Sequence, residues 1–118
     1  MTMQRQTLGK WGEERAVDEL ERRGYAILAR RYRTRHGEID IVADDAGTLV
    51  FVEVKARESE EFGSAAEAVT IHKQRRLASM AVDYLARNHV TNRPCRFDVV
   101  AIDGPIVTVY VNAFETSR

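Results

Sequence analysis

Three ionisable side chains lie within or beside two strongly apolar stretches of this 118-residue chain. Asp40 ends a Gly-Glu-Ile-Asp segment, and Glu53 and Lys55 alternate with valines in a Val-Glu-Val-Lys segment. Two carboxylates can hold a divalent cation, and an amine beside them can orient a water molecule or stabilise charge on a phosphate. The residue types and their spacing therefore indicate a metal-dependent active site.

Side-chain alternation predicts how these residues are presented. Residues 48–56 have the period of a strand, with three valines on one face and Leu49, Phe51, Glu53 and Lys55 on the other. Both faces are apolar at their start, as expected for a central strand covered on both sides. Residues 38–43 predict the preceding strand, in which Ile39 and Ile41 share one face and Asp40 lies on the other.

The link at residues 44–47 is short enough for a hairpin. A loop of two or four residues puts Asp40 on the same face as Glu53, whereas a three-residue loop needs a bulge to do so. Paired carboxylates repel, and burying them unpaired costs more. A bound cation would remove that penalty, and Lys55 alone would remove only part of it. A Glu-Val-Lys tripeptide on its own is usually a solvated cross-strand pair, but the upstream acidic strand favours the site.

Composition indicates one ordinary globular domain. The chain is 44% hydrophobic and 31% charged, and no apolar run approaches membrane-spanning length. The first 14 residues are polar and charged, so they do not resemble a signal peptide. The single cysteine, Cys95, excludes an internal disulfide and suits a reducing compartment. We therefore expect a cytoplasmic protein without a membrane segment, in which Cys95 is a small buried group.

The net charge is zero, which taken alone argues against nucleic acid, but charge is unevenly distributed. Residues 1–36 carry nine Lys or Arg against five acids, residues 37–70 two against nine, and residues 71–118 seven against four. The basic flanks could contact phosphates, and the alternative is a solvated strand edge and helix face. The candidate contacts are Arg31, Arg33, Arg35, His36, Arg57, Lys73 and Arg76.

The remaining patterns complete an α/β chain of the order α-β-β-β-α-β-β, with a central mixed five-stranded sheet flanked by helices. The further elements expected are a helix at 7–23 closed by Gly24, a strand at 25–33, a polar loop at 58–64, a short helical piece around 65–69, a helix from about 70 to 88, and strands at 96–102 and 106–111. Asp98 interrupts an apolar strand, and we interpret it as a structural partner for an arginine.

Five motifs occur together: a helix beginning Leu-Gly-Lys-Trp-Gly-Glu-Glu, the Gly-Glu-Ile-Asp strand, a Val-Phe-Val-Glu-Val-Lys strand, the Lys-Gln helix start and a Cys-Arg-Phe-Asp-Val strand. This combination resembles the YraN-type family of small bacterial proteins over nearly the whole chain. That family is similar to archaeal Holliday-junction resolvases and to the PD-(D/E)XK, or restriction-endonuclease-like, nucleases. The resemblance implies a single restriction-endonuclease-like domain and, as in the resolvases, a homodimer.

The resemblance also implies roles for individual residues. Asp40 and Glu53 would be the two acids of the nuclease motif and Lys55 its lysine. Glu13 matches the helical glutamate of the resolvases, and Gln74 matches a polar residue of the later helix that would contact nucleic acid. The proline that names the motif is absent, and the neutral net charge departs from the usually basic resolvases.

Phosphodiester hydrolysis requires a nucleophilic water and relief of transition-state charge, and Mg²⁺ or Mn²⁺ supplies both. Asp40 and Glu53 would be ligands with the Val54 carbonyl as a third, and Lys55 would lie beside the water and the phosphate. Glu13 could ligate a second metal or hold a metal-bound water, or simply favour the dipole of its helix.

We therefore expect a metal-dependent endonuclease acting on structured or branched DNA. Two alternatives belong to other classes. One is a nucleic-acid-binding module that no longer cuts, and the other is a scaffold in DNA repair or uptake that uses the acids as a structural metal site. The intact set of two acids and a lysine favours the enzyme.

Overall fold

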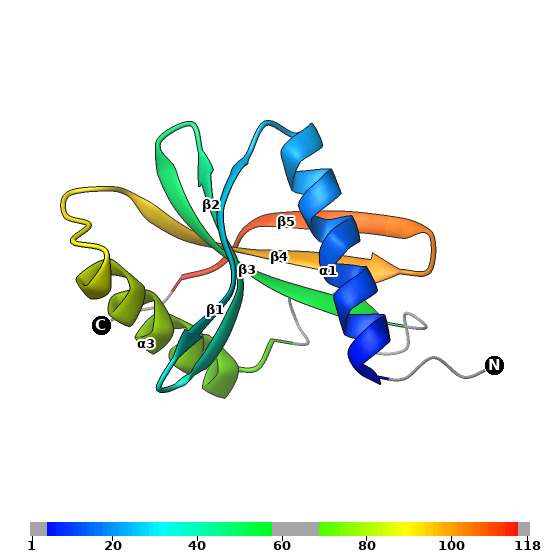
Figure 1. Ribbon diagram of the computed structural model, residues 1–118, viewed down its shortest axis with the longest axis horizontal. Coiled ribbons are helices and arrows are strands. Elements are labelled where there is room, and N and C mark those ends of the chain that lie inside the picture. The colour runs from blue at the N-terminus through cyan, green and yellow to red at the C-terminus, as the bar shows by residue number, and fades with distance from the viewer. Residues whose placement is uncertain (1–4, 58–68, 116–118) are drawn as a thin grey trace.

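The computed structural model describes residues 5–57 and 69–115, with the backbone alone for residues 5–10 and Arg57. A twisted mixed sheet of five strands separates one helix on each side (Figure 1). The elements are α1 (Arg5–Arg22), β1 (Ala26–Thr34), β2 (Gly37–Asp45), β3 (Thr48–Arg57), α3 (Ile71–Arg87), β4 (Cys95–Asp103) and β5 (Ile106–Phe114). The predicted class and element order are confirmed. The polar loop expected at 58–64, and nearly all of the helical piece expected around 65–69, lie outside the described residues.

The sheet runs β1-β2-β3-β4-β5. Its neighbouring strands are antiparallel except β3 and β4, which run parallel and are joined through α3. A parallel connection needs a crossover, and α3 provides it. This places β3 in the centre of the sheet, which explains why its sequence is apolar on both faces.

Local signals fix the ends of both helices. After α1, Gly24 adopts a φ of +93°, and the Tyr25 N–H donates to the Leu20 carbonyl at 3.0 Å. This is a Schellman-type ending, and it turns the chain into β1. At the start of α3, the Thr70 hydroxyl accepts the Lys73 N–H at 3.2 Å. That N-cap fixes Lys73 in the first turn of α3.

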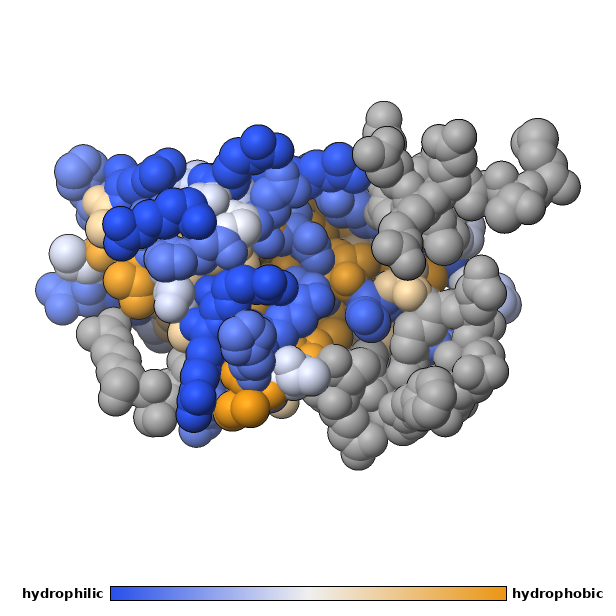
Figure 2. Space-filling view, turned by 90° about the horizontal axis from the view of Figure 1, so that it is seen from below, coloured by the Kyte–Doolittle hydropathy of each residue, from blue (hydrophilic) through white to orange (hydrophobic). Residues whose placement is uncertain are grey.

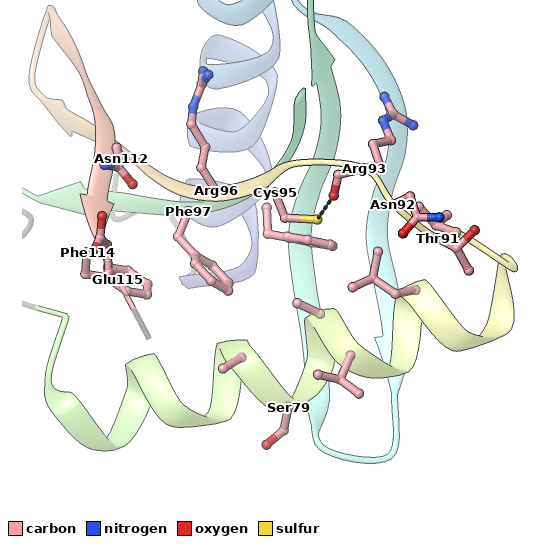
Figure 3. Close-up of a pocket in the computed structure, with 16 residues that line it drawn as sticks. Ser79, Thr91, Asn92, Arg93, Cys95, Arg96, Phe97, Asn112, Phe114 and Glu115 are labelled. Atoms are coloured by element: carbon pink, nitrogen blue, oxygen red, sulfur yellow. Dashed lines mark hydrogen bonds between the residues drawn. The ribbon is translucent and has the colours of Figure 1, made fainter. Parts of the chain in front are cut away.

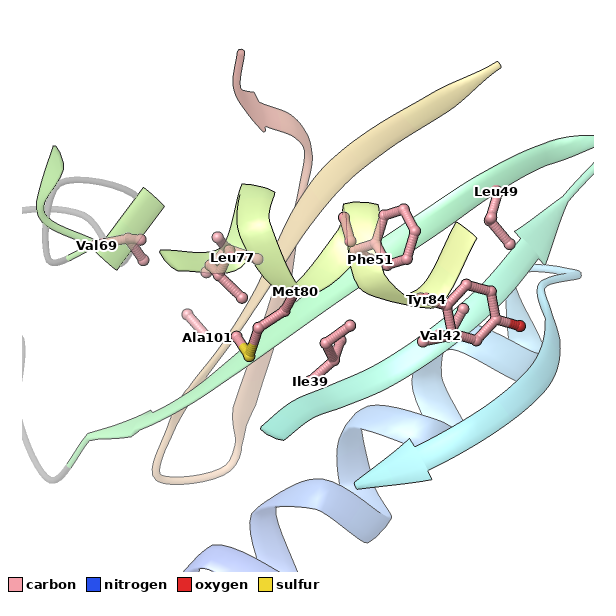
Figure 4. Close-up of a cluster of buried hydrophobic side chains, with 11 residues drawn as sticks. Ile39, Val42, Leu49, Phe51, Val69, Leu77, Met80, Tyr84 and Ala101 are labelled. Atoms are coloured by element: carbon pink, nitrogen blue, oxygen red, sulfur yellow. The ribbon is translucent and has the colours of Figure 1, made fainter. Parts of the chain in front are cut away.

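Each face of the sheet has its own apolar cluster. The cluster under α3 is built from Ile39, Val42, Leu49, Phe51, Val69, Leu77, Met80, Ala81, Tyr84, Val99 and Ala101 (Figure 4). Tyr84 lies edge-on to Tyr32 and Phe51, with ring centroids 4.9 and 5.7 Å apart. The cluster under α1 is built from Ala16, Val17, Leu20, Tyr25, Ile41, Ala43, Val50, Val52, Val100 and Ile102. Figure 2 shows the molecule from below, where hydrophilic side chains predominate and hydrophobic ones are visible between them.

The prediction that Ile39 and Ile41 share a face is wrong. Ile39 packs in the cluster under α3, and Ile41 packs in the cluster under α1. The alternation of faces is interrupted between the Tyr32↔Ile39 and Arg30↔Ile41 pairs of the β1–β2 ladder, and Arg31, which lies between them, has a φ of +50°. A residue in the left-handed region breaks the regular pleat. Asp40 therefore lies where the regular alternation of β2 side chains between the two faces of the sheet is interrupted.

The prediction that Cys95 is buried is also wrong, because its side chain is exposed. Cys95 begins β4 at the end of the sheet, and its thiol contacts the Arg93 carbonyl at 3.5 Å. It lines a cavity of about 860 Å³ between α3 and the β4–β5 hairpin, whose floor includes Phe97 and Phe114 (Figure 3). A strand-initial residue beside an open cavity is not covered, whatever its intrinsic preference for burial.

Candidate active site

The two predicted acids lie where β2 and β3 separate. A two-residue turn at Ala46 and Gly47, both with positive φ, joins the strands, and their ladder runs from Asp45↔Thr48 to Ile41↔Val52. The next residues along this register are Asp40 and Glu53, so the loop has one of the lengths that bring them together. Beyond this point β3 continues beside β4 while β2 stays with β1. The acids therefore stand at a fork in the sheet.

Asp40 is partly buried inside that fork. Its Oδ2 accepts the Val54 N–H at 2.8 Å, in the place of a backbone bond that the separated strands no longer make. The N–H and carbonyl of one strand residue point to the same side, so the Val54 carbonyl also faces β2. Burial, the charge of Glu53 and, to a smaller extent, the charge of Glu13 raise the pKa of Asp40, while the Val54 N–H and Lys73 oppose the rise, and the net result is a pKa of about 7. Asp40 thus lies in surplus negative potential.

Glu53 is buried, with 7% of the residue exposed, on the face covered by α3. Its carboxylate forms an ion pair with the Lys73 ammonium from the first turn of α3. The sequence predicted Lys73 as a phosphate contact, and no short-range pattern linked it to Glu53. The structure therefore joins Lys73 to the predicted acids through Glu53.

Lys55 follows Glu53 on the same face of β3 and is partly buried. In the parallel ladder it lies opposite Ala101, two positions beyond the Glu53↔Val99 pair. The backbone thus places Lys55 two residues along β3 from Glu53, on the same face of the sheet. The catalytic role of Lys55 stays a prediction.

Glu13 reaches the same region from α1. It is buried, and its oxygens lie 2.9 Å from Arg31 Nε and 3.5 Å from Arg30 Nε. Its charge acts on Asp40, but within residues 5–57 and 69–115 no three His, Cys, Asp or Glu side chains are grouped closely enough to hold a metal. The role of Glu13 as a metal ligand stays a prediction, and its observed partners are arginines.

Comparison with known proteins identifies the family. The family model described as "Uncharacterised protein family UPF0102" matches residues 12–102. The chain belongs to the UPF0102 family. A UPF0102 protein of Symbiobacterium thermophilum is 52% identical over 99 residues, which cover 83% of this chain and 84% of the relative. One from Ralstonia pickettii is 50% identical over 110 residues, covering 90% and 88%. One from Lachnoclostridium phytofermentans is 47% identical over 114 residues, covering 96% and 97%.

These matches confirm the family assignment made from the motifs. The relatives are named by family alone, so they establish membership and supply no activity. In the described part of this UPF0102 chain, neither helix combines the length and apolar character that crossing a membrane requires.

Several predicted nucleic-acid contacts of this UPF0102 protein lie at the tip of the β1–β2 hairpin. Arg35 and His36 form its two-residue turn and are exposed. Arg33 forms an exposed ion pair with Glu38 at 3.0 Å, so its charge is only partly available to a ligand. Arg31 is held by Glu13, as described above. The tip therefore offers basic groups beside the fork but fewer free charges than the sequence indicates.

The other predicted contacts lie on α3 and β3. Gln74 donates from Nε2 to the Val69 carbonyl at 3.0 Å, which secures the start of the helix. Arg76 is exposed one turn further along. The backbone of Arg57 ends β3, and its side chain lies outside the described residues. The structure thus brings Lys73 into the acidic pair and leaves Arg76 at the surface.

The prediction for Asp98 is confirmed. Asp98 is completely buried and accepts hydrogen bonds from Arg96 at 3.0 Å, the Tyr25 hydroxyl at 2.7 Å and the Asn112 N–H at 2.9 Å. Arg96 also contacts Asp45 at 2.7 Å, so the network joins β4 to the β2–β3 hairpin. Burial and the Asp98 charge raise the pKa of Tyr25 to about 12, which keeps its hydroxyl a donor.

Proposed function

We propose that this UPF0102 protein is a metal-dependent endonuclease that hydrolyses phosphodiester bonds in structured or branched DNA. The observation that carries the proposal is the convergence of Asp40 and Glu53 at the β2–β3 fork, with the pKa of Asp40 raised to about 7. Burying two carboxylates side by side costs free energy, so stability alone does not explain the arrangement. Such an arrangement is expected where a cation or a proton is to be bound.

The donor set fits Mg²⁺ or Mn²⁺. Two carboxylates and a backbone carbonyl from Val54 are hard oxygen ligands, and they leave positions for water, as Mg²⁺ prefers. A structural zinc site would instead require grouped cysteine or histidine ligands. When bound, the ion would lower the pKa of a coordinated water and relieve charge on the phosphate. Asp40 and Glu53 would hold it.

Lys55 and Glu13 supply supporting roles. An ammonium at Lys55 can orient the attacking water and offset negative charge that develops on the phosphate. Glu13 fixes Arg30 and Arg31 against α1, which keeps two guanidinium groups close to the fork. These arginines, with the basic turn at Arg35, are suited to contact the phosphates that flank the cut bond.

The proposed substrate follows from charge and symmetry. A chain of zero net charge gains little from non-specific attraction to long DNA, so local contacts with a shaped substrate must contribute more. A four-way junction needs two symmetric cuts, and a homodimer would supply two sites. Sedimentation with and without DNA tests this part. A monomer under both conditions would favour cleavage of a single strand.

A cleavage screen tests the activity. Linear, flap, single-stranded and four-way DNA substrates would be incubated with Mg²⁺, Mn²⁺ or a chelator. We expect cleavage of branched substrates that requires metal, is lost in Glu53→Gln and persists in Asp18→Asn, which alters an exposed acid on α1. Cleavage by Glu53→Gln at the parental rate would contradict the proposal. Metal and DNA binding without cleavage of any substrate would instead support the non-cleaving module.

A further inference from the structure

Lys73 contacts one member of the acidic pair, Glu53, directly. Its ammonium pairs with Glu53, whose side chain is only 9% exposed, whereas the Lys73 side chain remains 29% exposed. The contact therefore joins a carboxylate fixed in the sheet to an amine that can still reach water. Lys73 comes from α3, so it approaches Glu53 across the face of the sheet rather than along β3.

This ammonium acts on both acids. It neutralises Glu53 directly, and its charge also opposes the rise in the pKa of Asp40. A buried carboxylate without a partner is strongly destabilising, so Lys73 supplies positive charge that the fork needs in order to remain folded. A divalent ion held by Asp40 and Glu53 would supply the same charge to the same oxygens. The two cations would also repel each other at such short range.

We propose that Lys73 is a resident counter-cation that competes with the divalent ion for Glu53 and, once displaced, contacts a phosphate of the bound nucleic acid. This inference rests on the proposed function and adds a form of regulation to it. Lysine suits the role because its ammonium is a point charge on a flexible stem. Since displacement by the metal frees the ammonium for phosphate, metal and nucleic acid bind cooperatively, and by linkage each strengthens the other.

The contrast with Arg33 and Glu38 shows why this pair is more than a surface contact. In that pair the two side chains are 83% and 40% exposed, so water already solvates both charges. Glu53 has no such solvation, so the cation that contacts it must neutralise its charge. Competition between cations is therefore expected at Glu53 and not at Glu38.

Titration calorimetry with Mn²⁺ tests the competition. Lys73→Met removes the charge, and Lys73→Gln removes it but keeps a hydrogen-bond donor for Glu53, which guards against loss of folding. We expect both variants to bind Mn²⁺ about 5- to 100-fold more tightly than the parent. Arg75→Met is the matched control, because it removes an exposed charge from the same end of α3, and it should bind as the parent does.

Nucleic-acid binding gives the second readout. With a four-way DNA that carries cleavage-resistant linkages, and whose strands are checked to be intact after the measurement, Mn²⁺ should raise the affinity of the parent more than that of Lys73→Gln. Unchanged or weaker Mn²⁺ binding by both Lys73 variants, with binding retained by the parent, would overturn the role of Lys73 and leave the proposed nuclease intact. Absence of Mn²⁺ binding by the parent would overturn both proposals.

Discussion

Two groups of charged side chains lie in the same sheet, and they differ in how completely the charge of their acids is balanced. Around Asp98, a completely buried carboxylate receives donors from Tyr25, Arg96 and Asn112, so its charge is balanced and its oxygens are satisfied. At the fork, Asp40 receives one backbone N–H and faces the negative charge of Glu53. The first arrangement stabilises the fold, and the second leaves negative charge in surplus. That surplus distinguishes a structural group from a candidate functional one.

The difference follows from strand geometry. Near the β2–β3 turn the strands are closed by backbone pairing, and Arg96 can reach both Asp45 and Asp98. At the fork the strands separate. Asp40 accepts the backbone N–H of Val54, and Glu53 pairs with Lys73 from α3, so neither of these contacts is made by a guanidinium.

The largest expected effect is on the structural network. Asp98→Ala leaves Arg96 and the Tyr25 hydroxyl without their shared acceptor, so the free energy of unfolding should fall by about 3–5 kcal/mol. Urea unfolding measures this. Asp45→Ala is the control, since Asp45 is 32% exposed and contacts the same arginine, and it should cost less than about 1 kcal/mol. Equal losses in the two variants would show that burial does not set the value of this network.

The next effect concerns Lys55. Because Lys73 already contacts Glu53, Lys55→Met should fold, keep near-parental stability and bind Mn²⁺ and DNA, yet lose about 100-fold in cleavage rate. Thermal melts with and without Mn²⁺, paired with single-turnover cleavage, measure both quantities. A folded, metal-binding variant that cuts at the parental rate would falsify the catalytic role. A loss of about 3–5 kcal/mol of stability without metal would instead make Lys55 a neutralising group.

A smaller effect should appear in the pH dependence of stability. The pKa of Asp40 rises on folding from 3.8 to about 7, so the folded state binds more protons between these values. The unfolding free energy of chelator-treated protein should therefore fall by about 1–3 kcal/mol, after allowance for partial exposure, as pH rises from about 4 to about 7, and level off above that. Asp40→Asn should lack this component. If the unfolding free energy of Asp40→Asn depends on pH as that of the parent does, a group other than Asp40 is titrating.

Much of the fold could be predicted because its signals are local. Alternation along β3, the two-residue turn before it and the Thr70 cap of α3 each act over a few residues. The same signals favoured the pairing of Asp40 with Glu53 but left the loop length open between two, three and four residues. The two-residue turn found in the structure fixes the register. Asp98 could be assigned to an arginine because a buried acid on an apolar strand requires one.

The remaining features depend on contacts between distant parts of the chain. Ile39 and Ile41 lie on different faces at a place where Arg31 of the neighbouring strand has a positive φ, and no glycine marks that place in the sequence. Lys73 meets Glu53 only because α3 docks across the sheet, which no spacing along the chain specifies. Cys95 is exposed because a cavity lies beside the first residue of β4. These are tertiary effects that override local preference.

The most direct test of the metal site is a calorimetric titration with Mn²⁺ at several pH values. It compares the parent with Asp40→Asn and with the exposed control Asp18→Asn. Since the ion and a proton compete for Asp40, the parent should bind Mn²⁺ weakly and more tightly as pH rises through about 7. Asp18→Asn should behave as the parent, and Asp40→Asn should show no detectable binding. Parental affinity in Asp40→Asn would contradict the claim that the β2–β3 fork is a metal site.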